Sequence, residues 1–297
     1  PPYFQHLAEE PIDSFAGSQT SAATTEGLVV RILQVFDPAE YNRYVTEAMN
    51  GVVTISHKQL VDANGKEVPM ILLPTIEDVR KIWGAMGAYM KNVFTIPTIA
   101  LTGSVGKTTA ILFLETIFKQ RNRVFLSGRN RNNSEMIIQR MIEEYGPDYD
   151  YHIQEVGGGG PGVVERSARF LNCDAFAILN IFPHHLDRYK TLDAILQDKS
   201  CFDRMEKENK FGIINIDDDM LRNHSFNSRM VTCGITHKEA DYVAENVRQD
   251  GIYLRMDIAH NGVKTPIQIN IPGVHNAYNA VVAFAMAKEW GLTDKEI

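Results

Sequence analysis

The sequence is poor in cysteine and lacks long apolar runs, and each shortage excludes a class of protein. Its three cysteines, Cys173, Cys201 and Cys233, are far apart and odd in number. They form neither a disulfide framework nor a C-x-x-C metal site, which favours a reducing, cytoplasmic compartment. The longest apolar runs, such as residues 280–287, are too short to cross a bilayer. We therefore expect no membrane insertion.

Positive charge is also scarce. The 30 Lys and Arg residues are outnumbered by 37 Asp and Glu residues, which gives a net charge of −7. We expect no nucleic-acid partner, because such binding needs a basic surface and no long basic run is present. The start of the chain, PPYF, is not that of a signal peptide. The 297 residues, 44% of them hydrophobic, can bury a sizeable core in two domains or one large one.

The stretch that organises the chain is residues 98–118, TIALTGSVGKTTAILFLETIF. A short apolar run predicts a buried strand, a turn bounded by Gly103 and Gly106 follows, and an apolar-rich segment predicts a helix. Backbone N–H groups of such a turn and the positive end of the helix dipole bind phosphate. Lys107 supplies a charge for β- and γ-phosphates, and the Thr108 hydroxyl can ligate Mg²⁺. The expected binding residues are Gly103, Ser104, Val105, Gly106, Lys107, Thr108 and Thr109.

This stretch departs from the strict P-loop pattern at one position, because Leu101 stands where the first glycine is expected. A helix N-terminus with a solvated lysine would give the same residues. The strand before the turn and the helix after it favour a phosphate site over that alternative.

Strands and helices alternate from residue 98 to residue 232, which predicts an α/β fold with a doubly wound, mostly parallel sheet. Residues 241–271 change to a period of two, with turns at 250–251 and 261–262, and predict a small antiparallel annex. A helix follows at 275–290. Ligands of such a fold bind at the carboxyl ends of the strands.

A smaller α/β unit is expected before the P-loop. Residues 27–92 contain alternating strand and helix patterns, and the preceding 25 residues are polar and small, as in a flexible arm. We therefore divide the chain into an N-terminal domain, residues 1–95, and a central P-loop ATPase domain, residues 96–297.

Several other polar residues fall at or after the predicted strands. Glu155 closes one strand and precedes four glycines, so its carboxylate can hold Mg²⁺ or cap the next helix. His184 and His185 follow the next strand and can bind a metal or phosphate, or remain merely solvated. Lys199 lies in a predicted helix over 192–206, where a solvated side chain is the simplest interpretation. Asparagine pairs, Asn132–Asn133 and Asn276 with Asn279, can contact a nucleotide or cap helices.

Together these segments resemble the Mur ligase family of ATP-dependent amide-bond ligases, which act on peptidoglycan precursors in cell-wall biogenesis. Order and spacing match over about 190 residues. Within the family, EVG with its glycines and NIDDD look closest to the branch that adds D-alanyl-D-alanine to a UDP-muramoyl-tripeptide. The matching stretches are TGSVGKTT at 102–109, NN at 132–133, EVGGGGPG at 155–162, NIFPHHLDRYKT at 180–191, DKS at 198–200, NIDDDML at 215–221 and PGVHNAYNAVVAFAMA at 272–287.

The resemblance implies catalytic roles for four residues: Lys107, Glu155, His185 and Lys199. Lys107 and Thr108 would hold the γ-phosphate of ATP and a Mg²⁺ ion, and Glu155 would hold the same ion. His185 would bind a second Mg²⁺. Lys199 would carry a carbamate whose oxygens ligate that second ion, which reverses the interpretation of Lys199 as a solvated residue.

The resemblance also implies nucleotide contacts outside the P-loop. Asn133 would contact the phosphates, and Asn276 or Asn279 the adenine. The partners would be a UDP-linked muramoyl peptide and an incoming amino acid or dipeptide. The N-terminal domain has no clear match to the UDP-muramoyl-binding pattern, and the family's C-terminal domain, expected after Ile297, is absent from this chain.

The sequence thus predicts an ADP-forming ligase that activates a carboxylate as an acyl phosphate. Two alternatives remain: a cyanophycin or poly-amino-acid type ligase, and a regulatory protein that binds nucleotide without turnover.

Overall fold

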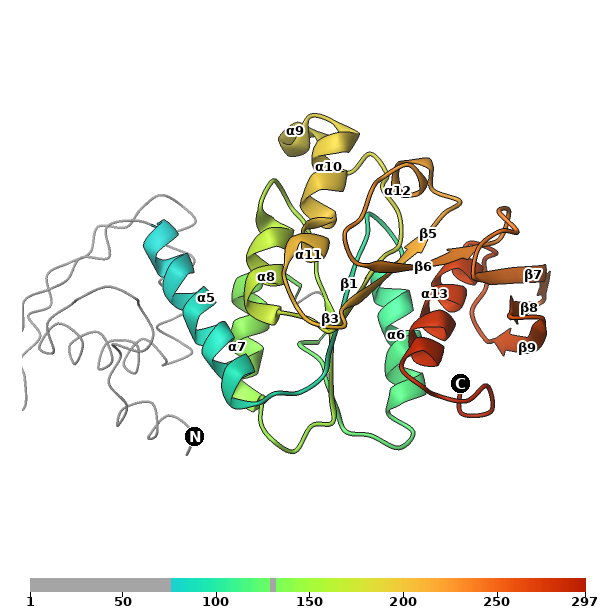
Figure 1. The fold of residues 1–297 in the computed structure, drawn as a ribbon, viewed down its shortest axis with the longest axis horizontal. Helices are drawn as coiled ribbons and strands as arrows, with labels where there is room; N and C mark the ends of the chain where they lie inside the picture. The colour runs from blue at the N-terminus through green and yellow to red at the C-terminus, as the bar shows by residue number, and fades with distance from the viewer. Residues whose placement is uncertain (1–75, 129–131) are drawn as a thin grey trace, which may run out of the picture. The chain divides into compact units, whose positions relative to one another are not determined.

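The computed structural model describes residues 76–128 and 132–297 (Figure 1). Contacts divide the chain into two units, Pro1–Ala85 and Met86–Ile297, and the sheet that bears the P-loop belongs to the second. The strands and helices predicted over residues 27–75, and the arm over residues 1–25, lie outside the described residues.

The described strands form one sheet of nine, in the order β2-β3-β1-β4-β5-β6-β7-β8-β9. Neighbouring strands from β2 to β7 are parallel, and β8 and β9 are antiparallel to their neighbours. The predicted doubly wound, mostly parallel sheet is confirmed. The strands are β1 (Thr98–Thr102), β2 (Val124–Phe125), β3 (Tyr151–Glu155), β4 (Ala175–Ile178), β5 (Phe211–Asn215), β6 (Arg229–Gly234), β7 (Tyr242–Asp250), β8 (Tyr253–His260) and β9 (Val263–Ile269).

Helices cover both faces of the sheet (Figure 1). One side carries α6 and α13, which pack on each other, and the other carries α7, α8, α10 and α11. Within residues 76–128 and 132–297, no helix combines the length and apolarity needed to cross a bilayer. The helices are α5 (Ile76–Val93), α6 (Lys107–Phe118), α7 (Ser134–Glu144), α8 (Val163–Leu171), α9 (Leu186–Tyr189), α10 (Leu192–Lys199), α11 (Cys201–Arg204), α12 (Asp219–Arg222) and α13 (Asn276–Glu289).

Two features of the predicted order are different in the structure. The helix expected over 192–206 is divided into α10 and α11 at Ser200. The Ser200 hydroxyl donates to the carbonyl oxygen of Gln197 at 3.4 Å, and such local bonds compete with regular helix geometry. The short helices α9 and α12 were not predicted, because four residues carry too little periodicity to be recognised.

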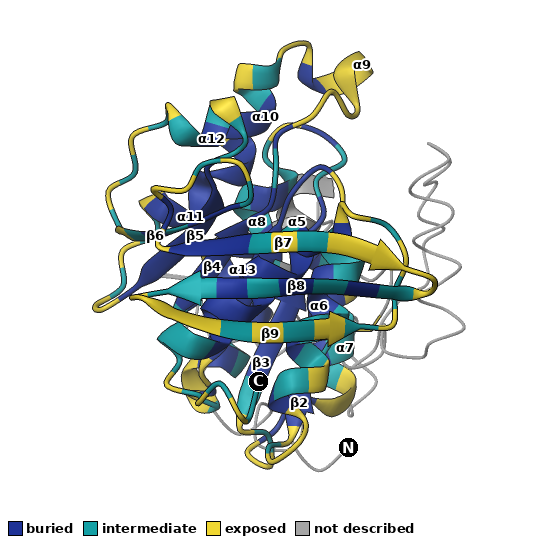
Figure 2. Ribbon diagram, turned by 90° about the vertical axis from the view of Figure 1, so that its right-hand side faces the viewer, coloured by how far each residue is buried: buried dark blue, intermediate teal, exposed yellow. Residues whose placement is uncertain are grey.

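The antiparallel strands continue the main sheet. β7 pairs with β6 in parallel through Cys233–Tyr242 and Gly234–Val243, and the turns predicted at 250–251 and 261–262 connect β7, β8 and β9. Figure 2 shows β7 buried where it joins the sheet and exposed toward its end. The Asp217 carboxylate accepts N–H bonds from Ile235, Thr236 and His237, which fixes the short connection between β6 and β7.

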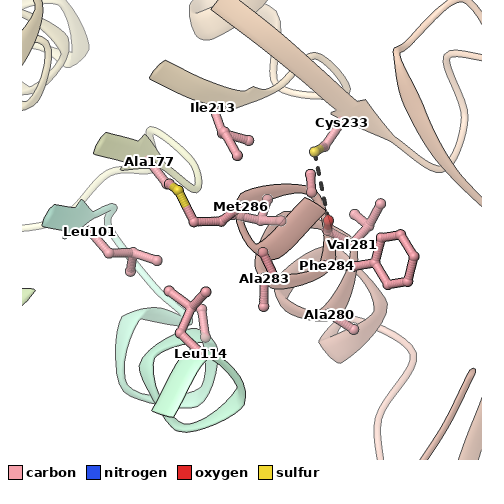
Figure 3. Close-up of a cluster of buried hydrophobic side chains, with 14 of the residues drawn as sticks. Leu101, Leu114, Ala177, Ile213, Cys233, Ala280, Val281, Ala283, Phe284 and Met286 are labelled. Atoms are coloured by element: carbon pink, nitrogen blue, oxygen red, sulfur yellow. Dashed lines mark hydrogen bonds between the residues drawn. The ribbon is translucent and has the colours of Figure 1, made fainter. Parts of the chain in front are cut away.

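The hydrophobic core of the second unit lies around α13 (Figure 3). This helix is buried on nearly every face, which is typical of a helix surrounded by other elements. Its alanines let neighbouring backbones approach, while Met286 extends toward Leu114 of α6 and Ala177 of β4. On the opposite side, the Cys233 thiol points to the carbonyl oxygen of Val281 at 3.8 Å. The start of α13 is thereby fixed beside the P-loop.

Candidate active site

The P-loop lies between β1 and α6, at the carboxyl edge of the sheet. Gly106 adopts φ 86°, a left-handed conformation that favours glycine. A Cβ atom there would lie 2.5 Å from Asn279 Oδ1, so the turn and the start of α13 are in close contact. Gly106 is therefore required for two independent reasons, its backbone angle and the space around it.

The Lys107 side chain bends back over its own turn. Its Nζ donates to the carbonyl oxygens of Gly103 at 2.9 Å and Ser104 at 3.3 Å. Burial lowers the pKa of Lys107, and the nearby Glu155 carboxylate opposes that shift. The charge of Lys107 thus lies at the glycine turn, where the sequence predicts phosphate.

Glu155 joins the P-loop helix to the loop that follows β2. One carboxylate oxygen accepts from Thr108 Oγ1 at 3.0 Å, and the other accepts from Asn132 Nδ2 at 2.8 Å. The structure therefore places Asn132 at Glu155, whereas Asn133, our predicted phosphate contact, caps α7 by accepting from the Met136 N–H at 2.9 Å. Pattern alone could not rank the two asparagines, because the helix boundary decides which one caps.

Asn180, which follows β4, clamps the other side of the P-loop. Its Oδ1 accepts from the N–H groups of Ser104 at 3.0 Å and Val105 at 2.9 Å, and its Nδ2 donates to the Val105 carbonyl at 3.0 Å. In the sequence this residue stands out only as the start of the histidine loop. The available signal was its position, a polar side chain directly beyond a buried strand.

The two histidines lie in an exposed loop before α9 (Figure 2). Their ring centroids are 4.0 Å apart, and His185, with φ 53°, is the N-cap residue of α9. Partial burial and the charges of His185, Lys107 and Lys199 lower the pKa of His184. The histidine loop is thus within electrostatic reach of both lysines.

Lys199 is buried, with 3% of its surface exposed, so the interpretation as a solvated helical lysine is wrong. Burial lowers its pKa from the ordinary value of 10.5 to about 8. The charge of Lys107 lowers the pKa further, and that of Asp198 opposes the shift. The amine of Lys199 is thus more readily uncharged near neutral pH than that of an exposed lysine.

Asp198 connects three segments around the site. Its Oδ1 accepts from the Gly162 N–H at 3.0 Å, and its Oδ2 accepts from the Tyr189 hydroxyl at 2.5 Å. Burial and the Asp198 carboxylate raise the pKa of Tyr189, so the hydroxyl stays protonated and donates. A Cβ atom on Gly158 would lie 2.7 Å from the Tyr189 oxygen, so part of the glycine-rich loop packs directly on this tyrosine.

Asn276 and Asn279 lie together at the start of α13, both nearly fully buried. Asn279 Nδ2 donates to Asn276 Oδ1 at 3.1 Å, and Asn276 Nδ2 donates to the Pro272 carbonyl at 2.8 Å. The pair therefore braces the loop before α13, and Asn279 also contacts Gly106.

The side chains available for Mg²⁺ are few, but they suit this ion. Within the residues that the structure describes, no group of three His, Cys, Asp or Glu side chains could hold a metal. Mg²⁺ is usually held by one or two carboxylates together with waters and substrate phosphates. The Thr108 hydroxyl and the Glu155 carboxylate, 3.0 Å apart beside the P-loop, fit that requirement.

The parallel sheet and the glycine turn at its carboxyl edge define a P-loop α/β domain. The family model described as "Mur ligase middle domain" matches residues 101–287, and the chain belongs to the Mur ligase family.

Its curated relatives carry the names of several ligases. The UDP-N-acetylmuramoyl-tripeptide–D-alanyl-D-alanine ligase of Synechocystis is 26% identical over 84% of this chain and 52% of its own length. The UDP-N-acetylmuramate–L-alanine ligase of Caldicellulosiruptor bescii is 27% identical over 70% of this chain and 44% of its own length. The chain thus spans about half the length of the curated relatives it matches.

Solved structures share the fold. MurF from Acinetobacter baumannii has a TM-score of 0.67 and 23% identity, and covers 79% of this chain and 53% of its own. MurF from Thermotoga maritima in complex with ADP has a TM-score of 0.66 and 18% identity, and covers 85% of this chain and 58% of its own.

Proposed function

We propose that this chain provides the nucleotide site of an ATP-dependent, ADP-forming amide ligase. The observation that carries the proposal is the Thr108–Glu155 hydrogen bond, which brings the P-loop helix and the carboxylate after β3 to one point. Lys107 lies at the same turn. Bound ADP in the Thermotoga relative supports a nucleotide as the ligand of this fold.

The reaction has two steps. An oxygen of the substrate carboxylate attacks the γ-phosphorus of ATP, the bond to the β-phosphate oxygen breaks, and an acyl phosphate and ADP result. The nitrogen of an incoming amine then attacks the acyl carbon, inorganic phosphate leaves, and the nitrogen loses a proton to give the amide. Lys107 binds the transferring phosphoryl group, and the N–H groups of the turn orient it.

Thr108 and Glu155 would hold one Mg²⁺, which neutralises phosphate charge during the transfer. His185 and Lys199 would hold a second ion. For that role Lys199 must bear a carbamate, formed when its uncharged amine attacks CO₂ and releases a proton. The buried position of Lys199 and its pKa of about 8 support this modification, because an uncharged amine is the reactive form.

Asn132 is the asparagine that we propose for the phosphate side of the site, since it contacts Glu155. Asn133 would contribute through its cap on α7. Asn276 and Asn279 would contact adenine, and the closeness of Asn279 to Gly106 of the P-loop supports a site at the start of α13.

We propose D-alanyl-D-alanine addition to a UDP-muramoyl-tripeptide as the particular reaction. Support comes from the EVGGGGPG and NIDDD stretches, and from relatives of that name in Synechocystis and Escherichia coli. Other relatives are named as L-alanine, D-glutamate and diaminopimelate ligases, so their names differ in both the UDP-linked substrate and the amine. Residues 1–95 are our proposed binding domain for the UDP-linked peptide.

The test separates nucleotide binding from ligation. Calorimetric titration should show Mg·ATP binding to the chain, and Glu155→Gln should weaken it while leaving metal-free ATP binding unchanged. In the full-length protein, ADP release should then require UDP-muramoyl-tripeptide and D-alanyl-D-alanine. L-Alanine, D-glutamate and diaminopimelate are the alternative amines, each tested with the UDP-linked substrate that its ligase's name gives. ATP binding without ADP release for any pair would indicate a nucleotide-binding scaffold, and absence of Mg·ATP binding would refute the site itself.

A further inference from the structure

We infer that Asp198 is a positioning residue that fixes, relative to one another, three segments that contain or directly follow the proposed Mg²⁺ ligands. This inference rests on the proposed function of the site. The three segments are the loop after Glu155, helix α9 after His185, and the end of α10 at Lys199.

The first link runs from Asp198 to the loop that follows β3. That loop enters α8 through Gly162, an N-cap residue that has no side chain to satisfy the free N–H groups of the helix. The Asp198 carboxylate supplies the cap from a different helix, because Oδ1 accepts from the Gly162 N–H at 3.0 Å and Oδ2 lies 3.5 Å from the Val164 N–H. A negative charge at this helix end is also favoured by the helix dipole.

The second link runs from Asp198 to α9. Oδ2 accepts from the Tyr189 hydroxyl, and the Tyr189 N–H donates to the carbonyl oxygen of His185 at 3.0 Å. Tyr189 is the buried residue of α9, whereas Leu186 to Arg188 are exposed. The tyrosine therefore provides the buried attachment of the histidine loop, and it connects that loop to the same carboxylate as the glycine-rich loop.

The third link is covalent, because Lys199 directly follows Asp198 in α10. Asp198 is only 6% exposed, so its carboxylate is enclosed by these partners. Buried carboxylates that hold several donors fix the geometry of the segments they join. Removal of a group hydrogen-bonded to a metal ligand typically changes metal affinity by about 10- to 100-fold. We expect an effect of that order for Asp198, which acts on the ligands through the segments that it joins.

Mn²⁺ titration of the chain in the presence of ADP, followed by electron paramagnetic resonance, tests this inference. Asp198→Ala should weaken Mn²⁺ binding by about 10- to 100-fold. Asp198→Asn should retain most of the affinity, because the amide can accept from Gly162 and donate to the tyrosine oxygen. Tyr189→Phe, which keeps the Gly162 contact, should give an intermediate loss.

Asp203→Ala is the matched control. Asp203 is similarly buried and accepts from the N–H groups of Asn227 and Ser228, in a segment that contains none of the proposed ligands. It should lower the melting temperature of the protein without changing the affinity for Mn²⁺. An equal loss of affinity in Asp203→Ala and Asp198→Ala would reduce the role of Asp198 to general stability and overturn the inference.

His185→Ala distinguishes the inference from the function on which it rests. If His185→Ala weakens Mn²⁺ binding and Asp198→Ala does not, the positioning role of Asp198 is refuted, and the proposed metal site is supported. If neither substitution changes Mn²⁺ binding, the proposed second metal site at His185 and Lys199 is wrong, and the inference is refuted with it, while the Thr108–Glu155 site is untouched.

Discussion

Thr108 Oγ1 and Glu155 Oε2 are 3.0 Å apart, although 47 residues separate them in the chain. The parallel pairing of β1 with β3 creates this proximity, because it places Leu101 opposite Glu155 and so brings the P-loop beside the end of β3. Two oxygen ligands that the sequence presents separately thus become one candidate site.

Lys107→Ala should weaken Mg·ATP binding while preserving the fold. The hydrogen bonds of its side chain run to carbonyl oxygens of its own turn, so its loss should cost little stability. A hydrogen bond to a charged phosphate contributes about 1.5–3 kcal/mol, so the affinity should fall roughly 10- to 100-fold. Calorimetry and thermal unfolding measure the two effects. Lys119→Ala, at the other end of α6, is the control, and wild-type affinity in Lys107→Ala would contradict the phosphate assignment.

Gly106→Ala should destabilise the domain by about 1–3 kcal/mol, the usual cost of an unfavourable backbone angle. A clash with Asn279 adds to this, because the new Cβ would lie 2.5 Å from its Oδ1. In the double variant Gly106→Ala/Asn279→Ala the clash disappears and the backbone strain remains. Its loss of unfolding free energy should therefore be smaller than the sum of the losses in the two single variants. Urea unfolding of the four proteins measures this difference. Strict additivity would show that the two residues are not in contact.

Lys199→Ala should abolish ADP release, and a short carboxylic acid in the medium should restore part of it by supplying the oxygen ligands of the lost carbamate. In the wild-type protein, incubation with ¹³C-labelled bicarbonate should give a carbamate carbon signal that Lys199→Ala lacks. The matched control is Lys210→Ala, because Lys210 is another buried lysine but donates to carbonyl oxygens of the α11 segment. Normal turnover by Lys199→Ala would exclude the carbamate role.

Lys91 makes the stability of this unit depend on pH. Its Nζ donates to the Ile96 carbonyl at 2.9 Å and the Tyr145 hydroxyl at 3.0 Å, and burial lowers its pKa from 10.5 to about 8. Between these pH values the unfolded chain retains a proton that the folded protein has released. The contribution of Lys91 to the free energy of unfolding therefore rises with pH, by at most about 1.4 kcal/mol per pH unit.

The measurement is the difference in unfolding free energy between the wild type and Lys91→Met, determined in urea from pH 8 to 9.5. That difference isolates Lys91, because the three buried cysteines, whose pKa values are raised, act in the opposite direction in both proteins. The difference should grow with pH. A constant difference for Lys91→Met would refute the assignment.

Local sequence patterns predicted most of the fold because alternation of apolar strands and helices is a short-range signal. The P-loop strand, its helix and the turns at 250–251 and 261–262 are all of this kind. The continuation of the sheet into β7 was not predicted, because the pairing of Cys233 with Tyr242 depends on a loop held by the distant Asp217.

Within the candidate site, residue types could be predicted, and their pairings could not. The strand end gave Glu155, but its bond to Asn132 depends on where α7 begins. Lys199 has the pattern of a surface helix residue, and only packing against neighbouring elements reveals that it is buried. The roles proposed for Lys107, His185 and the second asparagine pair stay predictions until the binding experiments are done.

The packing of α6 against α13 also determines the order of events during synthesis. The apolar face of α6, with Leu114 and Phe118, is covered by a helix that begins at Asn276. A ribosome adding about 5–20 residues per second needs roughly 10–30 seconds to make the intervening chain. Over that interval the apolar face of α6 lacks the helix that covers it in the folded protein. We therefore expect α6 to reach its native packing only after α13 has left the ribosome.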